Sequence, residues 1–140
     1  MKKKQISETK KKTLIEEISS LLKKRKSIIF GYIFGSFAED KKFSDIDIGI
    51  FISGEKSVDS LDFEIELEEK IQSFTNLPVD VRIINHAPLS FVYHVIKEGI
   101  LVKDENPSFR ADFEGMIFKK YLDFAFYRKQ YLKEVVNAPV

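Results

Sequence analysis

Two aspartates and a Gly-Ser pair are the residues of this sequence whose types and spacing could do chemistry. Asp45 and Asp47 open an apolar run that reaches Ile52. Side chains alternate across a β-strand, so the two carboxylates are expected to share one face. They repel each other unless a cation lies between them, and Mg²⁺ usually binds one or two carboxylates together with substrate phosphates. Asp is depleted in strands, which favours a metal site over turn capping or surface pairing.

Gly35 and Ser36 end the preceding apolar run, ten residues before the aspartates. A glycine lets the backbone approach a ligand closely. Residues 36–38 are expected to begin a short helix whose N-terminal amides point at phosphate oxygens. Ser36 alone would suit a plain turn or cap, but beside Asp45 and Asp47 it favours a phosphate-binding turn. A phosphate cradle next to a carboxylate pair suits phosphoryl or nucleotidyl transfer.

The elements that position these residues follow from hydrophobic periodicity and from capping and turn residues. Strands are predicted over 28–34, 45–52, 79–84 and 100–102, the last at a sheet edge, and helices over 13–24, 60–75, 85–98 and 107–135. The first helix is placed by Thr13 as N-cap with Glu16 in a capping box. Residues 60–75 also alternate like a strand, but their length and Glu-rich composition favour a helix. This order predicts an α/β fold with a small mixed sheet flanked by helices.

Composition predicts a single cytoplasmic domain. The chain has 140 residues and no cysteine, which excludes a disulfide framework and a zinc-thiolate site. Its apolar runs are shorter than the ~20 residues that span a bilayer, and the basic N-terminus lacks the apolar region of a secretory signal. The net charge of +1 gives no general attraction to nucleic acid or membrane.

We divide the chain into a basic tail at 1–12, a core at 13–105 and a C-terminal helix at 106–140. Residues 2–12 hold six lysines, and 23–26 are all basic. The first cluster fits a solvated tail, and the second fits cations at the C-terminus of a helix, where they are favoured. The alternative is that both form a basic rim that holds a triphosphate or a partner's RNA. The C-terminal helix carries aromatic residues that do not keep to one stripe. Such a helix packs on the core, forms an interface with a partner protein, or joins two copies of this chain in a homodimer.

The stretch from Gly31 to Ile52 resembles the signature of the DNA polymerase β-like nucleotidyltransferases. That signature is Gly-Ser, a short spacer, Asp-x-Asp and a third acid on a later strand. Here the third acid is Asp80, which could otherwise form a surface pair with Arg82. Within the superfamily, the small size and the C-terminal helix resemble the minimal nucleotidyltransferase (MNT) antitoxins, which are encoded beside HEPN-domain toxins.

One loop departs from the family pattern. Members often continue Gly-Ser-x-Ala with Arg-Gly, whereas this chain has Glu39 and Asp40. The loop therefore lacks the usual arginine and gains two negative charges near an anionic ligand. Lys41 and Lys42 are expected to offset those charges.

The resemblance implies a polymerase β-like fold and a mechanism. Asp45, Asp47 and Asp80 would bind Mg²⁺, with two ions during turnover, and Asp80 would orient or deprotonate the attacking hydroxyl. Gly35 and Ser36 would hold the β- and γ-phosphates of ATP. The hydroxyl would then attack the α-phosphorus in line, and pyrophosphate would leave.

Three functions are compatible with these residues. The resemblance implies an antitoxin that transfers AMP from ATP to a hydroxyl, that of a tyrosine, on a HEPN-type RNase toxin. The alternative is a non-catalytic antitoxin that binds the toxin tightly through the C-terminal helix. A weaker third candidate is a small-molecule adenylyltransferase with a separate substrate-binding subunit.

Overall fold

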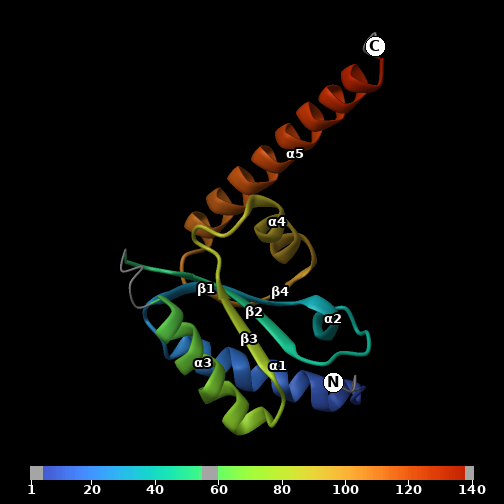
Figure 1. The fold of residues 1–140 in the computed structure, drawn as a ribbon. Helices are drawn as coiled ribbons and strands as arrows, with labels where there is room; N and C mark the ends of the chain where they lie inside the picture. Colours follow the sequence, from blue (N-terminus) through green and yellow to red (C-terminus); the bar gives the residue numbers. More distant parts are fainter. Residues whose placement is uncertain (1–4, 55–59, 138–140) are drawn as a thin grey trace.

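The computed structural model describes residues 5–54 and 60–137 (Figure 1). Residues 1–4 of the expected tail and 138–140 of the expected C-terminal segment lie outside this range. The elements are, in chain order, α1 (Glu8–Lys23), β1 (Ile28–Phe34), α2 (Gly35–Ala38), β2 (Ile46–Ile52), α3 (Ser60–Thr75), β3 (Val79–Ile83), α4 (Leu89–Glu98), β4 (Ile100–Asp104) and α5 (Pro107–Asn137).

The strands form one mixed sheet in the order β3-β2-β1-β4. β1 pairs antiparallel with both β2 and β4. β2 and β3 are parallel, so the chain must cross over between them, and α3 provides that crossover. The predicted small mixed α/β sheet is therefore confirmed, and β4 lies at its edge as expected.

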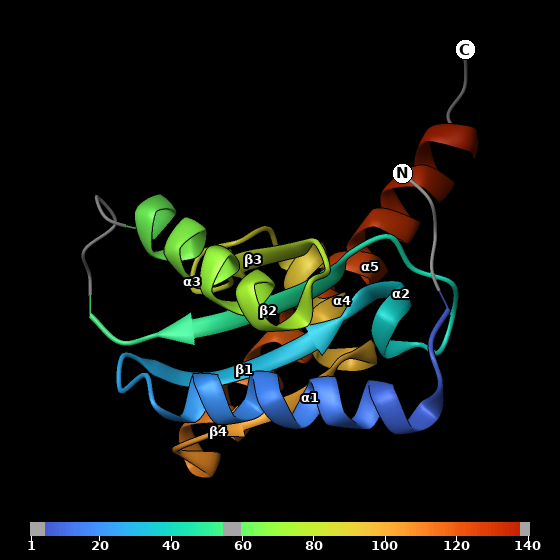
Figure 2. The ribbon, with the colours of Figure 1, turned by 90° about the horizontal axis from the view of Figure 1, so that it is seen from below.

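Helices cover both faces of the sheet (Figures 1 and 2). α1 and α3 pack on one face, and α4 with the first turns of α5 packs on the other. On β2, Ile46, Ile48 and Ile50 are fully buried against α1 and α3. Because side chains alternate, Asp47 points to the opposite face, which α4 covers. The candidate site therefore belongs to the α4 side of the sheet.

The ambiguous segment 60–75 is a helix. Leu67 and Ile71 are fully buried, while Phe63 and Phe74 pack at the margin of the same cluster. The helical stripe outweighs the alternating pattern because one continuous row of apolar side chains can cover the sheet.

The predicted start of the first helix at Thr13 is wrong. α1 begins at Glu8, and the Ser7 side chain caps it by accepting a hydrogen bond from the Lys10 amide. Lys11 is buried within this helix, and its ammonium lies 5.5 Å from the centre of the Phe37 ring. A lysine can cover apolar surface with its alkyl stem while its charge finds a partner. The lysine-rich residues 8–12 are thus helical.

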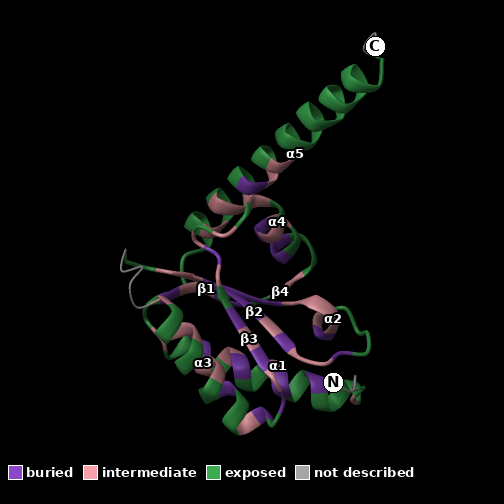
Figure 3. Cartoon of the chain, viewed as in Figure 1, coloured by how far each residue is buried: buried purple, intermediate pink, exposed green. Residues whose placement is uncertain are grey.

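α5 divides into a packed part and a projecting part. Phe109 and Phe113 pack on Phe30 and Phe51 of the sheet, with ring centres 5.0 to 6.3 Å apart. Beyond Tyr121 every described residue of the helix is exposed, and Figure 3 shows this part leaving the core. Within residues 5–54 and 60–137, no helix has the length and hydrophobicity that a bilayer crossing needs.

A polar network fixes the base of α5 to the sheet. The Tyr32 hydroxyl on β1 donates a 2.6 Å hydrogen bond to Glu114, and Arg110 donates to both Glu114 and Asp104 at 2.8 Å. Burial, and then the bond to Glu114, raises the pKa of Tyr32 above its ordinary value. The hydroxyl therefore keeps its proton and acts as a donor.

We expect Tyr32→Phe to lower the free energy of unfolding by about 1–2 kcal/mol, because a buried hydrogen bond to a charged acceptor is lost. Tyr127→Phe is the control, since Tyr127 is 69% exposed on the projecting part of α5. Urea unfolding of the two variants measures the difference. Equal stabilities would show that the network does not anchor the helix.

Candidate active site

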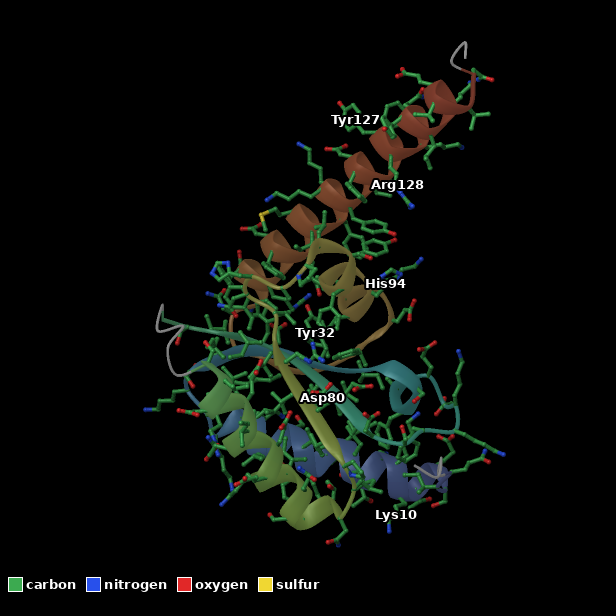
Figure 4. The ribbon with its side chains drawn as sticks, viewed as in Figure 1. Lys10, Tyr32, Asp80, His94, Tyr127 and Arg128 are labelled. Atoms are coloured by element: carbon green, nitrogen blue, oxygen red, sulfur yellow. The ribbon has the colours of Figure 1, made fainter. Side chains whose placement is uncertain are left out.

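The end of β1 and the beginnings of β2 and β3 meet at one place on the α4 side of the sheet. In the antiparallel β1–β2 pair, Phe34 lies opposite Asp47, and in the parallel β2–β3 pair Asp47 lies opposite Asp80. Asp47 is thus flanked by the Gly35 turn on one side and by Asp80 on the other. Figure 4 labels Asp80 on β3. The strand pairing brings together residues far apart in the sequence.

Gly35 is held against the Asp47 carboxylate. Its φ is +79°, and a β-carbon at this position would lie 2.3 Å from Asp47 Oδ2. Any other residue would meet both a strained backbone and a side chain in its way. Ser36 follows in the first turn of α2, which runs from Gly35 to Ala38. The predicted short helix after the glycine turn is confirmed.

Asp47 is the electrostatic centre of the site. Its pKa is raised from 3.8 to about 6, first by burial and then by the negative charges of Asp45 and Asp80, while Arg82 lowers it. Asp45 lies in the bend just before β2 rather than in the strand itself. The charges of Asp45 and Asp80 therefore both act on Asp47.

These carboxylates suit a divalent cation that also contacts phosphate. Among the described residues, no three His, Cys, Asp or Glu side chains form a complete cluster for a metal ion. Mg²⁺ needs only one or two protein carboxylates when substrate phosphates and water supply the other oxygens. A cation near Asp47 would also offset the burial and the repulsion that raise its pKa. The donor set therefore fits a metal shared with a nucleotide.

Asp80 takes part in a second interaction at the sheet edge. Its Oδ2 lies 3.5 Å from Arg82 Nε, and both side chains are substantially exposed. The Arg82 guanidinium also lies over the Phe91 ring of α4, 5.9 Å from its centre. The surface pair considered as an alternative for Asp80 thus exists. Asp80 is therefore both paired with Arg82 and adjacent to Asp47.

The acidic loop after α2 is locally neutralised. Asp40 forms an ion pair with Lys11 of α1, and Glu39 Oε1 lies 3.3 Å from Lys41 Nζ. Asp40 has φ +58°, a left-handed conformation that glycine adopts freely and Asp tolerates. This turn therefore takes its left-handed conformation without a glycine. Sequence reasoning missed Lys11, although its spacing from Leu14 and Ile18 in a helical stripe was a usable signal.

A mixed sheet that holds a glycine turn against paired acidic strands defines a nucleotidyltransferase type of domain. The family model described as polymerase beta, nucleotidyltransferase, matches residues 16–108. The chain belongs to this family. A search of curated proteins found no significant match.

Solved toxin–antitoxin complexes contain chains of similar fold. One is the tri-AMPylated Shewanella oneidensis HEPN toxin in complex with MNT antitoxin, where the match has a TM-score of 0.67 and 19% identity and covers 90% of this chain and 98% of that one. The MntA-HepT complex gives a TM-score of 0.66 and 19% identity, with 89% and 98% covered. A toxin-antitoxin structure with AMP-PNP gives 0.63 and 19%, with 94% and 99% covered. At this identity the likeness establishes the fold.

Gly35→Ala tests the close approach of the turn. We expect it to reduce stability by about 1–3 kcal/mol, because it combines left-handed strain with a clash against Asp47. Gly115→Ala is the matched control, since a β-carbon there would meet nothing within 4 Å. In mid-helix, that change should stabilise by about 0.5–1 kcal/mol. Thermal unfolding measures the stability of both variants. An unchanged stability in Gly35→Ala would contradict the assigned contact with Asp47.

Asp47→Asn tests the cost of the Asp47 charge, which arises from burial and from repulsion by Asp45 and Asp80. The native carboxyl holds its proton up to about pH 6 and the unfolded one only up to its ordinary value of 3.8. The free energy of unfolding therefore falls as the pH rises from about 3.8 to about 6, because the native state holds its proton longer than the unfolded state. By pH 7 Asp47 is ionised in both states, and its charge then destabilises the native state. We expect the variant to be more stable than wild type at pH 7 by about 1–2 kcal/mol, after allowance for solvent screening.

The difference between Asp47→Asn and wild type should shrink toward pH 4, as measured by urea unfolding without divalent cations. Asp123→Asn, on the exposed part of α5, is the control for loss of a carboxylate. A variant that is equally or less stable at pH 7 would contradict the assigned cost of the buried charge on Asp47.

Proposed function

We propose that this chain is an antitoxin nucleotidyltransferase that transfers AMP from ATP, with Mg²⁺, to a tyrosine hydroxyl of a HEPN-type RNase toxin. The observation that carries the proposal is the position of Asp47, flanked by the Gly35 turn and by Asp80, with its pKa raised to about 6. A carboxylate whose negative charge is disfavoured in this way is suited to bind a cation that also contacts a triphosphate.

Each residue has a role in the proposed reaction. The Gly35 amide and Ser36 hold the β- and γ-phosphates, and Asp45 with Asp47 would hold Mg²⁺, which supplies positive charge to the triphosphate. Asp80 orients the acceptor hydroxyl and takes its proton. The hydroxyl oxygen forms a bond to the α-phosphorus, the bond between the α-phosphorus and the bridging oxygen breaks, and pyrophosphate leaves.

The similar structures support the choice of acceptor. The HEPN toxin in one of them is tri-AMPylated, and another contains AMP-PNP. Both fit an adenine nucleotide as donor and a protein as acceptor. The family match supports nucleotidyl transfer as the reaction type.

The projecting part of α5 supports a protein partner. It exposes a series of large apolar side chains to solvent. Figure 3 shows this part of the helix coloured as exposed, and Figure 4 shows Tyr127 and Arg128 on it, away from the sheet. The series consists of Leu122, Phe124, Phe126, Tyr127, Tyr131, Leu132, Val135 and Val136. Exposed apolar surface of this extent typically marks an interface. The same observation favours the second candidate, an antitoxin that acts by binding alone.

Intact-mass measurement of a co-expressed HEPN partner separates these two functions. With wild-type protein we expect the partner to gain one or more AMP units, and with Asp45→Asn/Asp47→Asn we expect no gain, because the metal-binding carboxylates are removed. Asp112→Asn/Asp123→Asn, in exposed positions on α5, controls for the change of charge. A stable complex with an unmodified partner would contradict AMP transfer and support action by binding.

A further inference from the structure

A groove follows the free edge of β3 and reaches the candidate active site at Asp80. β3 is the outermost strand on this side of the sheet, and the cavity beside it measures about 540 Å³ between α3 and the start of α4. Its walls include Leu61, Ile65, Phe91, Glu64, Glu68 and Arg82. Asp80 is the member of the aspartate group that lines the cavity. A hydroxyl that approaches Asp80 through the groove would therefore arrive beside Asp47.

Two glutamates of α3 accept hydrogen bonds from two amides of this edge strand. Glu68 accepts a hydrogen bond from the Val81 amide, and Glu64 accepts one from the Ile83 amide, both at 2.8 Å. Edge strands with free amides readily add another strand. Here the carboxylates occupy those donors, so a bound segment would be recognised by its side chains and not by strand addition.

The charge of the groove is unbalanced. Among the described residues neither Glu64 nor Glu68 is in an ion pair, whereas Asp80 is paired with Arg82. Both glutamates are only partly exposed, which strengthens their interaction with an added charge. The groove is therefore complementary to a ligand with positive charge, and it would repel nucleic acid.

The dimensions favour a polypeptide. The groove is lined by α3 from Leu61 to Glu68, a separation of about 10 Å along a helix axis. This corresponds to roughly three residues of extended chain. The apolar side chains of Leu61 and Ile65 are exposed at its margin, 65% and 42% respectively. A mixed apolar and acidic surface of this length suits a short basic peptide segment.

We propose that this groove binds the segment of the partner protein that carries the acceptor hydroxyl, a basic stretch whose cations pair with Glu64 and Glu68. The inference rests on the proposed function, and it assigns the acceptor to one side of the site. The hydroxyl reaches Asp80 from the groove and gives up its proton there. Its oxygen then bonds to the α-phosphorus of ATP as pyrophosphate leaves.

Peptide binding to the full chain tests the groove directly. The probes are a fluorescent tyrosine peptide with flanking Lys and Arg, and the same peptide with Glu in their places, each measured by anisotropy. We expect wild-type protein to prefer the basic peptide, and Glu64→Gln/Glu68→Gln to bind it about tenfold more weakly, because two favourable charge contacts are lost. Glutamine keeps a carbonyl that can accept the β3 amides, and circular dichroism checks the fold.

Asp62→Asn/Glu69→Gln is the matched control. It removes the same charge from exposed positions of the same helix that do not line the groove, so we expect wild-type affinity. Equal binding by the groove variant, no preference for the basic peptide, or displacement of the peptide by spermine at equal affinity would overturn the proposal. The last result would assign the groove to a small polyamine.

AMP transfer to a co-expressed HEPN partner is measured on the same variants. We expect the groove variant to raise the KM for the partner with little change in kcat, since the reacting groups remain. Wild-type transfer with an unchanged KM in Glu64→Gln/Glu68→Gln would overturn the groove and leave the proposed function intact. If wild type bound the peptide in a charge-dependent way but transferred no AMP, the proposed function would be overturned and the groove would stand as a peptide-binding site.

Discussion

The close contact between the Gly35 turn and the Asp47 carboxylate constrains the rest of the site. An Asp47 oxygen occupies space that a β-carbon at residue 35 would need, so the residue that follows β1 must be a glycine with a left-handed backbone. β2 is paired on both sides, which fixes Asp47 between that turn and β3. Burial and the neighbouring aspartates then raise its pKa to about 6. The fold thus maintains an unfavourable charge arrangement that a bound cation can relieve.

The C-terminal helix is attached to the sheet at its N-terminal end and exposed to solvent at its C-terminal end. Partly buried hydrogen bonds join its base to the sheet, from Tyr32 to Glu114 and from Arg110 to Asp104, while the part beyond Tyr121 is exposed. A partner bound to the projecting part would therefore be held in a defined orientation to the core. In the proposed function this docking surface is separate from the groove at β3, which receives the acceptor segment.

Local patterns in the sequence predicted the strands and the pair Asp45 and Asp47, whereas Asp80 was assigned through the family resemblance. The apolar runs and the spacing of Asp45 and Asp47 were sufficient for β1 and β2, and the helical stripe in residues 60–75 identified α3. The start of α1 was missed because a lysine-rich stretch looks solvated, and only tertiary structure shows that Lys11 is covered and paired with Asp40. The capping of β3 by Glu64 and Glu68 was also missed, since no local pattern connects two helix glutamates with the amides of a later strand.

Calorimetric titration of AMP-PNP into the full chain, with Mg²⁺ and with EDTA, tests the central claim most directly. If the aspartate cluster exists to receive a cation and a triphosphate together, binding should require Mg²⁺ and should weaken by at least about tenfold in Asp47→Asn. The gain in affinity from Mg²⁺ should largely disappear in that variant. Equal binding in EDTA and in Mg²⁺, or wild-type affinity in Asp47→Asn, would contradict the assignment of the cluster as a nucleotide–metal site.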